Sequence, residues 1–479
     1  MIDINDRLEL LADDYLVESF SGKAGLRLHR PEPREAALVT NMPWEGCMTD
    51  YATVLRDGDK ALLYYGSWSF DFARDCPARP PSICLAESKD GIVWERTPVN
   101  IFEYQGISRN NIVWRGEEDD DYMGVAGFTP FLDEHSGCLP EQRYKAVGTG
   151  WSDPKKGLCL VTSADGIRWS LVPDKKAFIG YALDSQNVVF WDAMRGKYRA
   201  FIRTYNNRIR GIATAVSPDL TQWSEPVPLA YPGVPEEQLY TNNIQPYYRA
   251  PHIFLGFPTR YIQREWSPSI EALSELEHRR MRSKTNIRYG TALTDALFMS
   301  SRDGVNFRRW GEAFIRPGLR SEGNWTYGDN FVALGILETE SALPGGGKEL
   351  SLYSNEYNWR GEGRTLRRYT LRMDGFVSLN ATAEGGEMIT KPLLFSGRRL
   401  ALNISTSAAG RVYVELQDVN GHILPGYAMD DCLEIIGDTL DYTVRWKNGA
   451  DVGCLIGRPV RVRMMLHDAD LYSFRFTND

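Results

Sequence analysis

The chain has 479 residues, of which 43% are hydrophobic, 25% charged and 12% aromatic. This composition is that of a globular protein, and it excludes a collagen, a coiled coil and a wholly disordered chain. The formal net charge of −8 argues against a nucleic-acid partner or an anionic membrane surface, because both attract basic proteins. No run of about 18 apolar residues occurs, so we expect no membrane span.

Cysteine and histidine usage indicates neither a disulfide framework nor a metal site. The 7 cysteines are odd in number and contain no Cys-x-x-Cys pair, and the 6 histidines are scattered. We therefore expect no metal and no cofactor. Residues 1–11 carry acidic side chains where a secretory signal would need basic ones, and from this we expect a cytoplasmic protein.

A short motif, Ser-x-Asp-Gly-x-x-Trp or a relative of it, recurs along the chain. Its five copies centre on Asp90, Asp165, Asp219, Asp303 and Asp374. Their spacing ranges from 54 residues (165 to 219) to 84 residues (219 to 303), which suits four strands and their loops, the unit of a propeller blade. We predict that each turn joins the third strand of a blade to the fourth, so that these aspartates are structural. An irregular array of β-sandwiches is the alternative.

The segments between these turns are short and rich in aromatic and β-branched residues, which is typical of strands. They include residues 61–65, 144–147, 198–202, 253–257 and 350–353. We predict an all-β fold, with a five-bladed β-propeller over residues 1–390 and a β-sandwich over residues 391–479. A Ser-Pro start and mixed charge predict a helical insertion near 266–285. This insertion is either a solvated surface helix, a lid over the site or a subunit contact.

The propeller prediction places candidate site residues by geometry. The start of the innermost strand of a blade and the end of its second strand meet at one rim, where both face a central funnel. Predicted starts of inner strands carry Asp50, Asp184, Glu237 and Asp329. Predicted ends of second strands carry Trp68, Trp151, Arg203, Arg260 and Glu356.

Five carboxylates, two arginines and two tryptophans at one rim indicate carbohydrate chemistry. Glycoside hydrolysis requires two carboxylates that flank the bond, one to protonate the leaving oxygen and one to attack or to activate water. Tryptophan faces suit sugar rings, and arginine suits hydroxyl or carboxylate groups. Any single one of these acids could equally be a rim carboxylate in a salt bridge, whereas five together favour catalysis.

With these features the sequence resembles the five-bladed propeller glycosidases of glycoside hydrolase families 32 and 43. In the invertase-like family the acids follow the order Asp, Asp, Glu, which Asp50, Asp184 and Glu237 repeat. The resemblance implies that Asp50 is the nucleophile or base, Asp184 the transition-state stabiliser and Glu237 the acid/base. Around Asp50 the family's Asn-Asp-Pro motif is replaced by Met-Thr-Asp-Tyr, and Glu236 directly precedes Glu237, so either glutamate could hold that place.

The sequence therefore predicts a glycoside hydrolase that cleaves a fructo- or arabinofuranoside or a related small glycan. A glycoside phosphorylase or transglycosylase is the first alternative, in which Arg203 and Arg260 would bind phosphate. A non-catalytic carbohydrate-binding protein is the second, and self-association stays open. A separation of about 5–5.5 Å between the Asp50 and Glu237 carboxyl groups would indicate retention, and about 6.5–9.5 Å inversion.

Overall fold

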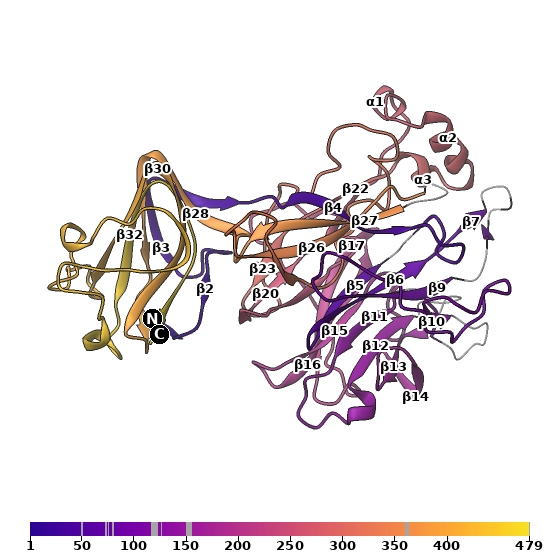
Figure 1. Ribbon diagram of the computed structural model, residues 1–479, viewed down its shortest axis with the longest axis horizontal. Helices are drawn as coiled ribbons and strands as arrows, with labels where there is room; N and C mark the ends of the chain where they lie inside the picture. Colours follow the sequence, from indigo (N-terminus) through magenta and orange to yellow (C-terminus); the bar gives the residue numbers. More distant parts are fainter. Residues whose placement is uncertain are drawn as a thin grey trace. The chain divides into compact units, whose positions relative to one another are not determined.

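The computed structural model describes residues 1–48, 51–71, 74, 76–78, 81–115, 123–125, 127–149, 156–359 and 364–478. Asp50 and Trp151, both predicted site residues, lie outside the described residues. The protein is all-β, as predicted (Figure 1). Within the described ranges, none of the helices has the length and the apolar character needed to cross a membrane.

Five four-stranded sheets follow one another along the described chain. The first contains β5 (Ala52–Asp57), β6 (Lys60–Ser67), β9 (Ser82–Ser88) and β10 (Ile112–Arg115). The second contains β11 (Thr129–Leu132), β12 (Tyr144–Thr149), β13 (Leu158–Ser163) and β14 (Ser170–Ala177). The third contains β15 (Val188–Asp192), β16 (Lys197–Asn206), β17 (Ile209–Ser217) and β18 (Val227–Pro228).

The fourth and fifth sheets depart from simple succession. The fourth contains β19 (Ile244–Tyr247), β20 (Ala250–Gly256), β23 (Met299–Ser301) and β24 (Arg308–Arg309). The fifth contains β25 (Leu337–Glu340), β26 (Lys348–Glu356), β27 (Arg364–Arg372) and β4 (Glu32–Thr40). Because β4 pairs with β27, the fourth strand of the last sheet comes from near the N-terminus of the chain.

The first strands of different sheets are hydrogen-bonded to one another near their beginnings. Thr53 of the first sheet pairs in parallel with Leu334, which leads into the fifth. Gln186, just before β15, donates to the carbonyl of Ala52 at 3.3 Å. Asn242, just before β19, donates to the carbonyl of Gln186 at 3.1 Å. These contacts bring the starts of the first strands together, although the residues are far apart in the sequence.

The repeated turns follow the third strand of each sheet, and their aspartates are structural, as predicted. Asp90 accepts hydrogen bonds from the backbone N–H groups of Ile92 and Val93 at 2.8 and 2.9 Å, and Ser88 Oγ accepts from Gly91 N–H at 2.8 Å. Corresponding turns form at Asp165, Asp219 and Asp303. Short polar side chains favour such turns because they satisfy nearby backbone donors.

Three helices interrupt the fourth sheet, where the sequence predicts a helical insertion. They are α1 (Pro268–Glu271), α2 (Leu276–Thr285) and α3 (Ile287–Thr291). The hairpin of β21 (Thr259–Ile262) and β22 (Leu293–Ala296) flanks them, and Figure 1 shows the three helices grouped beyond β22. Ser267 caps α1 by accepting from Ile270 N–H, which explains why the helix begins at the Ser-Pro pair.

The chain divides into two compact units. One comprises residues 31–246 and 252–370, and the other residues 1–30, 247–251 and 371–479. The second unit contains a six-stranded sheet formed by β2 (Glu9–Leu10), β3 (Val17–Leu28), β28 (Val377–Thr390), β30 (Arg399–Gln417), β31 (Asp438–Thr443) and β32 (Arg461–Thr477). Alternate residues of β30 and β32 form its hydrophobic core, and β3 brings the N-terminal segment into it by pairing with β28. The short strands β1 (Ile2–Asn5) and β29 (Leu393–Phe395) pair in parallel.

Candidate functional site

In the third sheet, the structure brings together the predicted residues Asp184 and Arg203. Asp184 lies shortly before β15, and Arg203 lies near the end of β16. The guanidinium of Arg203 is 3.6 Å from the Asp184 carboxylate and donates from Nε to the carbonyl of Ala182 at 2.8 Å. The Arg203 side chain is 10% exposed, whereas that of Asp184 is 64% exposed. A buried arginine thus holds the base of this loop while the carboxylate faces solvent.

Glu237, in the segment before β19, and Arg260, on β21, are likewise brought together. Arg260 Nη1 donates to Glu237 at 3.0 Å, and Arg309 on β24 donates to the second Glu237 oxygen. Arg260 also binds Asp295 through two hydrogen bonds of 2.9 and 2.7 Å. Burial raises the pKa of Asp295, and the Arg260 guanidinium opposes that rise. Both carboxylate oxygens of Glu237 are therefore already occupied by arginines.

In the first and fifth sheets, strand starts and strand ends also meet. The backbone of Met48 pairs with that of Trp68 at the end of β6. Asp329 accepts a hydrogen bond of 2.8 Å from the backbone N–H of Asn358, just after β26. Burial raises the pKa of Asp329 well above its usual range, and the nearby charge of Glu356 adds to this rise. Glu356 itself accepts hydrogen bonds of 2.7 Å from two residues of β27.

Beside these pairs, a cluster of aromatic side chains lies where the starts of several first strands converge. We call it the tyrosine cluster, and its buried aromatic members are Tyr51, Tyr240, Tyr261, Tyr327, Phe331 and Trp359. Tyr289 of α3 packs against it, with its ring 4.8 Å from that of Trp359. The cluster thus combines residues from the first, fourth and fifth sheets with one from the helical insertion.

Hydrogen bonds and charges connect the tyrosine cluster to the Asp184–Arg203 pair. Tyr327 Oη donates to Tyr240 Oη at 2.6 Å, and Ser185 Oγ, next to Asp184, donates to the Tyr240 carbonyl at 2.5 Å. Burial raises the pKa of Tyr240, the Asp184 charge adds to the rise, and Arg288 and Arg203 oppose it. Asp184 is therefore a predicted acid that the described structure places at this cluster.

Two further arginines lie over the tyrosine rings. Arg210, on β17, has its guanidinium carbon 4.7 Å from the ring centre of Tyr261 and 5.3 Å from that of Tyr240. Arg288, on α3, lies 5.5 Å from the ring centre of Tyr327. A guanidinium over an aromatic face is favourable because the ring carries negative charge on its faces. These contacts keep two cations at the cluster.

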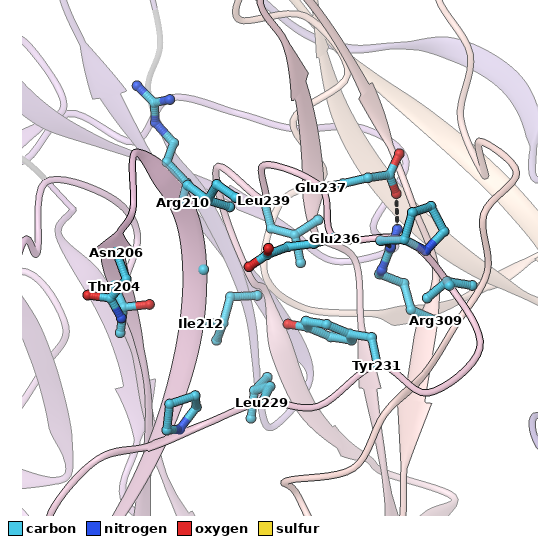
Figure 2. A pocket seen from close by; sticks show the side chains of 15 residues that line it. Thr204, Asn206, Arg210, Ile212, Leu229, Tyr231, Glu236, Glu237, Leu239 and Arg309 are labelled. Carbon is cyan, nitrogen blue, oxygen red and sulfur yellow. Dashed lines mark hydrogen bonds and ion pairs between the residues drawn. The ribbon is translucent and has the colours of Figure 1, made fainter.

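A cavity of about 260 Å³ lies next to this region (Figure 2). It is lined by Thr204 and Asn206 of the third sheet, by residues around Leu229, and by the segment that carries Glu236 and Glu237. In Figure 2, Glu236 points toward the middle of the lining residues, whereas Glu237 turns toward Arg309. The structure thus distinguishes the two neighbouring glutamates by their surroundings.

Sequence reasoning missed the tyrosine cluster and its arginines. A signal was present, because Tyr240 and Tyr327 each lie within three residues of a predicted acid, Glu237 and Asp329 respectively. The adjacent pair Arg288 and Tyr289 carried no comparable signal, since it ends a helical insertion. Within the described ranges, no group of three or more His, Cys, Asp or Glu side chains could hold a metal ion.

Comparison with known proteins gives similarity at the level of solved structures only. No family model matches the chain, and no curated protein sequence matches it. A glycoside hydrolase aligns with a TM-score of 0.42 and 15% identity, over 72% of this chain and 92% of its own. A glycosyl hydrolase from Bacteroides ovatus aligns with a TM-score of 0.41 and 14% identity, over 72% and 94%.

A third solved structure aligns over more of the chain. The Bombyx mori family 32 β-fructofuranosidase BmSUC1 aligns with a TM-score of 0.41 and 8% identity, over 94% of both chains. Because all these TM-scores lie below 0.5, we base the function on the site itself.

Proposed function

We propose that the protein is a glycoside hydrolase, built on a five-bladed β-propeller that is followed by a C-terminal β-sandwich. The observation that carries this proposal is the solvent-facing Asp184 carboxylate, held by the buried Arg203 beside the tyrosine cluster. The exposed carboxylate can reach the polar groups of a sugar, while the buried tyrosine cluster packs against the loop that carries it.

The arrangement of the sheets supports this proposal. The first strands of the first, third and fourth sheets begin near one another, as the hydrogen bonds of Gln186 and Asn242 indicate, and the bridge between Thr53 and Leu334 adds the segment that leads into the fifth. Side chains from distant parts of the sequence can therefore act on one substrate. The strand β4, from near the N-terminus, pairs with β27 and completes the fifth sheet, and this pairing would hold a ring of sheets closed.

In this proposal Asp184 is one of the carboxylates at the reacting bond, and Asp50 and Glu237 complete the set that the sequence resemblance implies. General acid–base catalysis by one positioned group contributes about 10²–10⁴-fold in rate. Both oxygens of the Glu237 carboxylate accept hydrogen bonds from arginines, and these contacts fix its position. The exposed Glu236 is the matched alternative for the acid role.

A panel of aryl furanosides and pyranosides tests the activity and the predicted furanoside class together. Asp50→Asn, Asp184→Asn and Glu237→Gln are each expected to lower kcat by about 10³-fold on the best substrate, with the folded state retained by circular dichroism. Glu236→Gln is the control and is expected to keep kcat within about threefold. Full activity of Asp184→Asn would refute the proposal, and loss of activity in Glu236→Gln alone would move the acid role from Glu237 to Glu236.

A further inference from the structure

Among the tyrosines of the cluster and the two arginines that lie over their rings, three polar atoms are buried without a hydrogen-bond partner in the described residues. They are the hydroxyl of Tyr261 and the Nε atoms of Arg210 and Arg288, for none of which the described residues provide a partner. The Tyr261 residue is only 2% exposed. A buried donor that lacks an acceptor destabilises the folded state, and more so when it is charged, so such atoms normally have a partner. Three together indicate a place where an acceptor from outside the protein binds.

The same three side chains lie near one another. Arg210 covers the face of Tyr261, with its guanidinium carbon 4.7 Å from the ring centre. Arg288 lies 5.5 Å from the ring centre of Tyr327, whose ring is 5.7 Å from that of Tyr261. Burial raises the pKa of the Tyr261 hydroxyl, and the guanidinium groups of Arg288 and Arg210 oppose that rise. Arg210 comes from β17 and Arg288 from α3, so the third sheet and the helical insertion approach Tyr261 of β21.

The charges of this region are unbalanced in favour of cations. Arg203 has Asp184 as its carboxylate partner, and Arg210 Nη1 donates to the neutral side chain of Gln238. Arg288 contacts the rings of Tyr289 and Tyr327, and it forms no ion pair among the described residues. Positive charge in a partly buried site attracts an anion, since low-dielectric surroundings strengthen the interaction.

We propose that Arg210, Arg288 and Tyr261 form a binding site for an oxyanion, either the carboxylate of an acidic sugar or a phosphate ion. Guanidinium groups match such planar or tetrahedral oxyanions, and a tyrosine hydroxyl adds a neutral donor. In the hydrolase proposed above, on which this reading of the ligand rests, the site selects glycans that carry a uronate-type carboxylate. If phosphate binds instead, the site supplies the second substrate of a phosphorylase.

Direct binding measurements test this site without any need for turnover. Isothermal titration calorimetry of the full chain would use glucuronate, its neutral counterpart glucose, and inorganic phosphate. We expect glucuronate to bind at least about tenfold more tightly than glucose, because a charge-assisted hydrogen bond to a carboxylate is stronger than a neutral one to a hydroxyl. The preference should weaken as salt is raised, since screening reduces the attraction between charges.

Three variants and a matched control connect the binding to these residues. Arg210→Gln and Arg288→Gln should each lower the affinity for the oxyanion by about tenfold or more, and Tyr261→Phe by a smaller factor. Arg280→Gln is the control, because Arg280 is a half-exposed cation of the same insertion that pairs with Glu271 and Glu277. It is expected to bind like the unmodified protein.

The outcomes distinguish between the two candidate ligands, an acidic sugar and phosphate. Glucuronate binding without phosphate binding assigns the site to an acidic sugar, and phosphate binding alone assigns it to phosphorolysis. Equal binding of glucose and glucuronate with no phosphate binding overturns the proposal, as does unchanged oxyanion affinity in folded Arg210→Gln and Arg288→Gln. If these variants do not fold, competition between phosphate and glucuronate on the unmodified protein decides whether one site binds both. Asp184→Asn should lower kcat by about 10³-fold yet keep oxyanion binding, so the binding measurement tests this site independently of catalysis.

Discussion

Replacement of Glu237 by alanine removes the carboxylate that holds two arginines, and its cost can be derived from the structure. Arg260 would keep its two hydrogen bonds to Asp295. Arg309, whose side chain is 1% exposed, would keep its hydrogen bond to the backbone carbonyl of Pro235 and lose its ion pair with Glu237. Removing one partner of a buried pair costs about 3–5 kcal/mol. Since Glu237 is itself 19% exposed, we expect about 3 kcal/mol, the lower end of this range.

Urea unfolding monitored by tryptophan fluorescence measures this loss. Glu236→Ala is the control, because Glu236 is exposed and its change should stay within about 0.5 kcal/mol. The double variant Glu237→Ala with Arg309→Met should be more stable than the sum of the two single changes predicts, by about 2 kcal/mol, since both partners of the pair are then absent. Equal stability of Glu237→Ala and Glu236→Ala, or strict additivity in the double variant, would refute the argument.

Three further predictions concern the scaffold. Gly166→Ala should lower the free energy of unfolding by about 1–3 kcal/mol, which is more than the loss in Gly180→Ala. Both glycines have positive φ, but a Cβ at Gly166 would lie 2.6 Å from the Tyr64 hydroxyl, whereas one at Gly180 would face open space. Thermal unfolding of the two variants measures the difference. Burial alone would raise the pKa of Asp133, yet hydrogen bonds from a buried lysine, a backbone N–H and a tyrosine bring it below its usual value. The ionised Asp133 carboxylate therefore stabilises the folded state above about pH 4, and this stabilisation is lost as pH falls through the folded pKa. Asp133→Asn should make the free energy of unfolding depend less on pH in the acid range. An unchanged pH dependence in that range would contradict this prediction. Asp374→Ala should lower the free energy of unfolding by about 3 kcal/mol, measured by urea unfolding, because the buried carboxylate accepts hydrogen bonds from a tyrosine, an arginine and a serine. A loss below about 1 kcal/mol would contradict this role.

Local sequence chemistry was sufficient to predict the strands and the repeated turns. Ser88 and Asp90 satisfy backbone donors within three residues of themselves, so the turn depends on almost nothing outside the motif. The Ser-Pro start of the insertion is local in the same way. Asp374 shows the limit of this reasoning, because its turn leads out of the fifth sheet and its carboxylate binds Tyr247 and Arg249 instead.

Two pairs of the predicted site residues lie side by side in the described structure. Asp184 meets Arg203 because the antiparallel pair β15 and β16 brings these ends together, whereas Glu237 meets Arg260 beside the bridge between Leu239 and Arg260 of β21. The Asp184–Arg203 pair could be expected from the sequence once these two strands were placed. The roles that the resemblance implies for Asp50, Asp184 and Glu237 stay predictions that the kinetic variants test.

The amino-acid sequence by itself determined what depends on neighbours along the chain: the all-β class, the turns, the insertion and the residues at each strand start. Only the tertiary structure decided which of these lie together between sheets. Tyr327 reaches Tyr240 across 87 positions, and Arg288 reaches both from an insertion that carries no repeat signal. Such contacts depend on how whole sheets and helices pack, and no short-range periodicity encodes that packing.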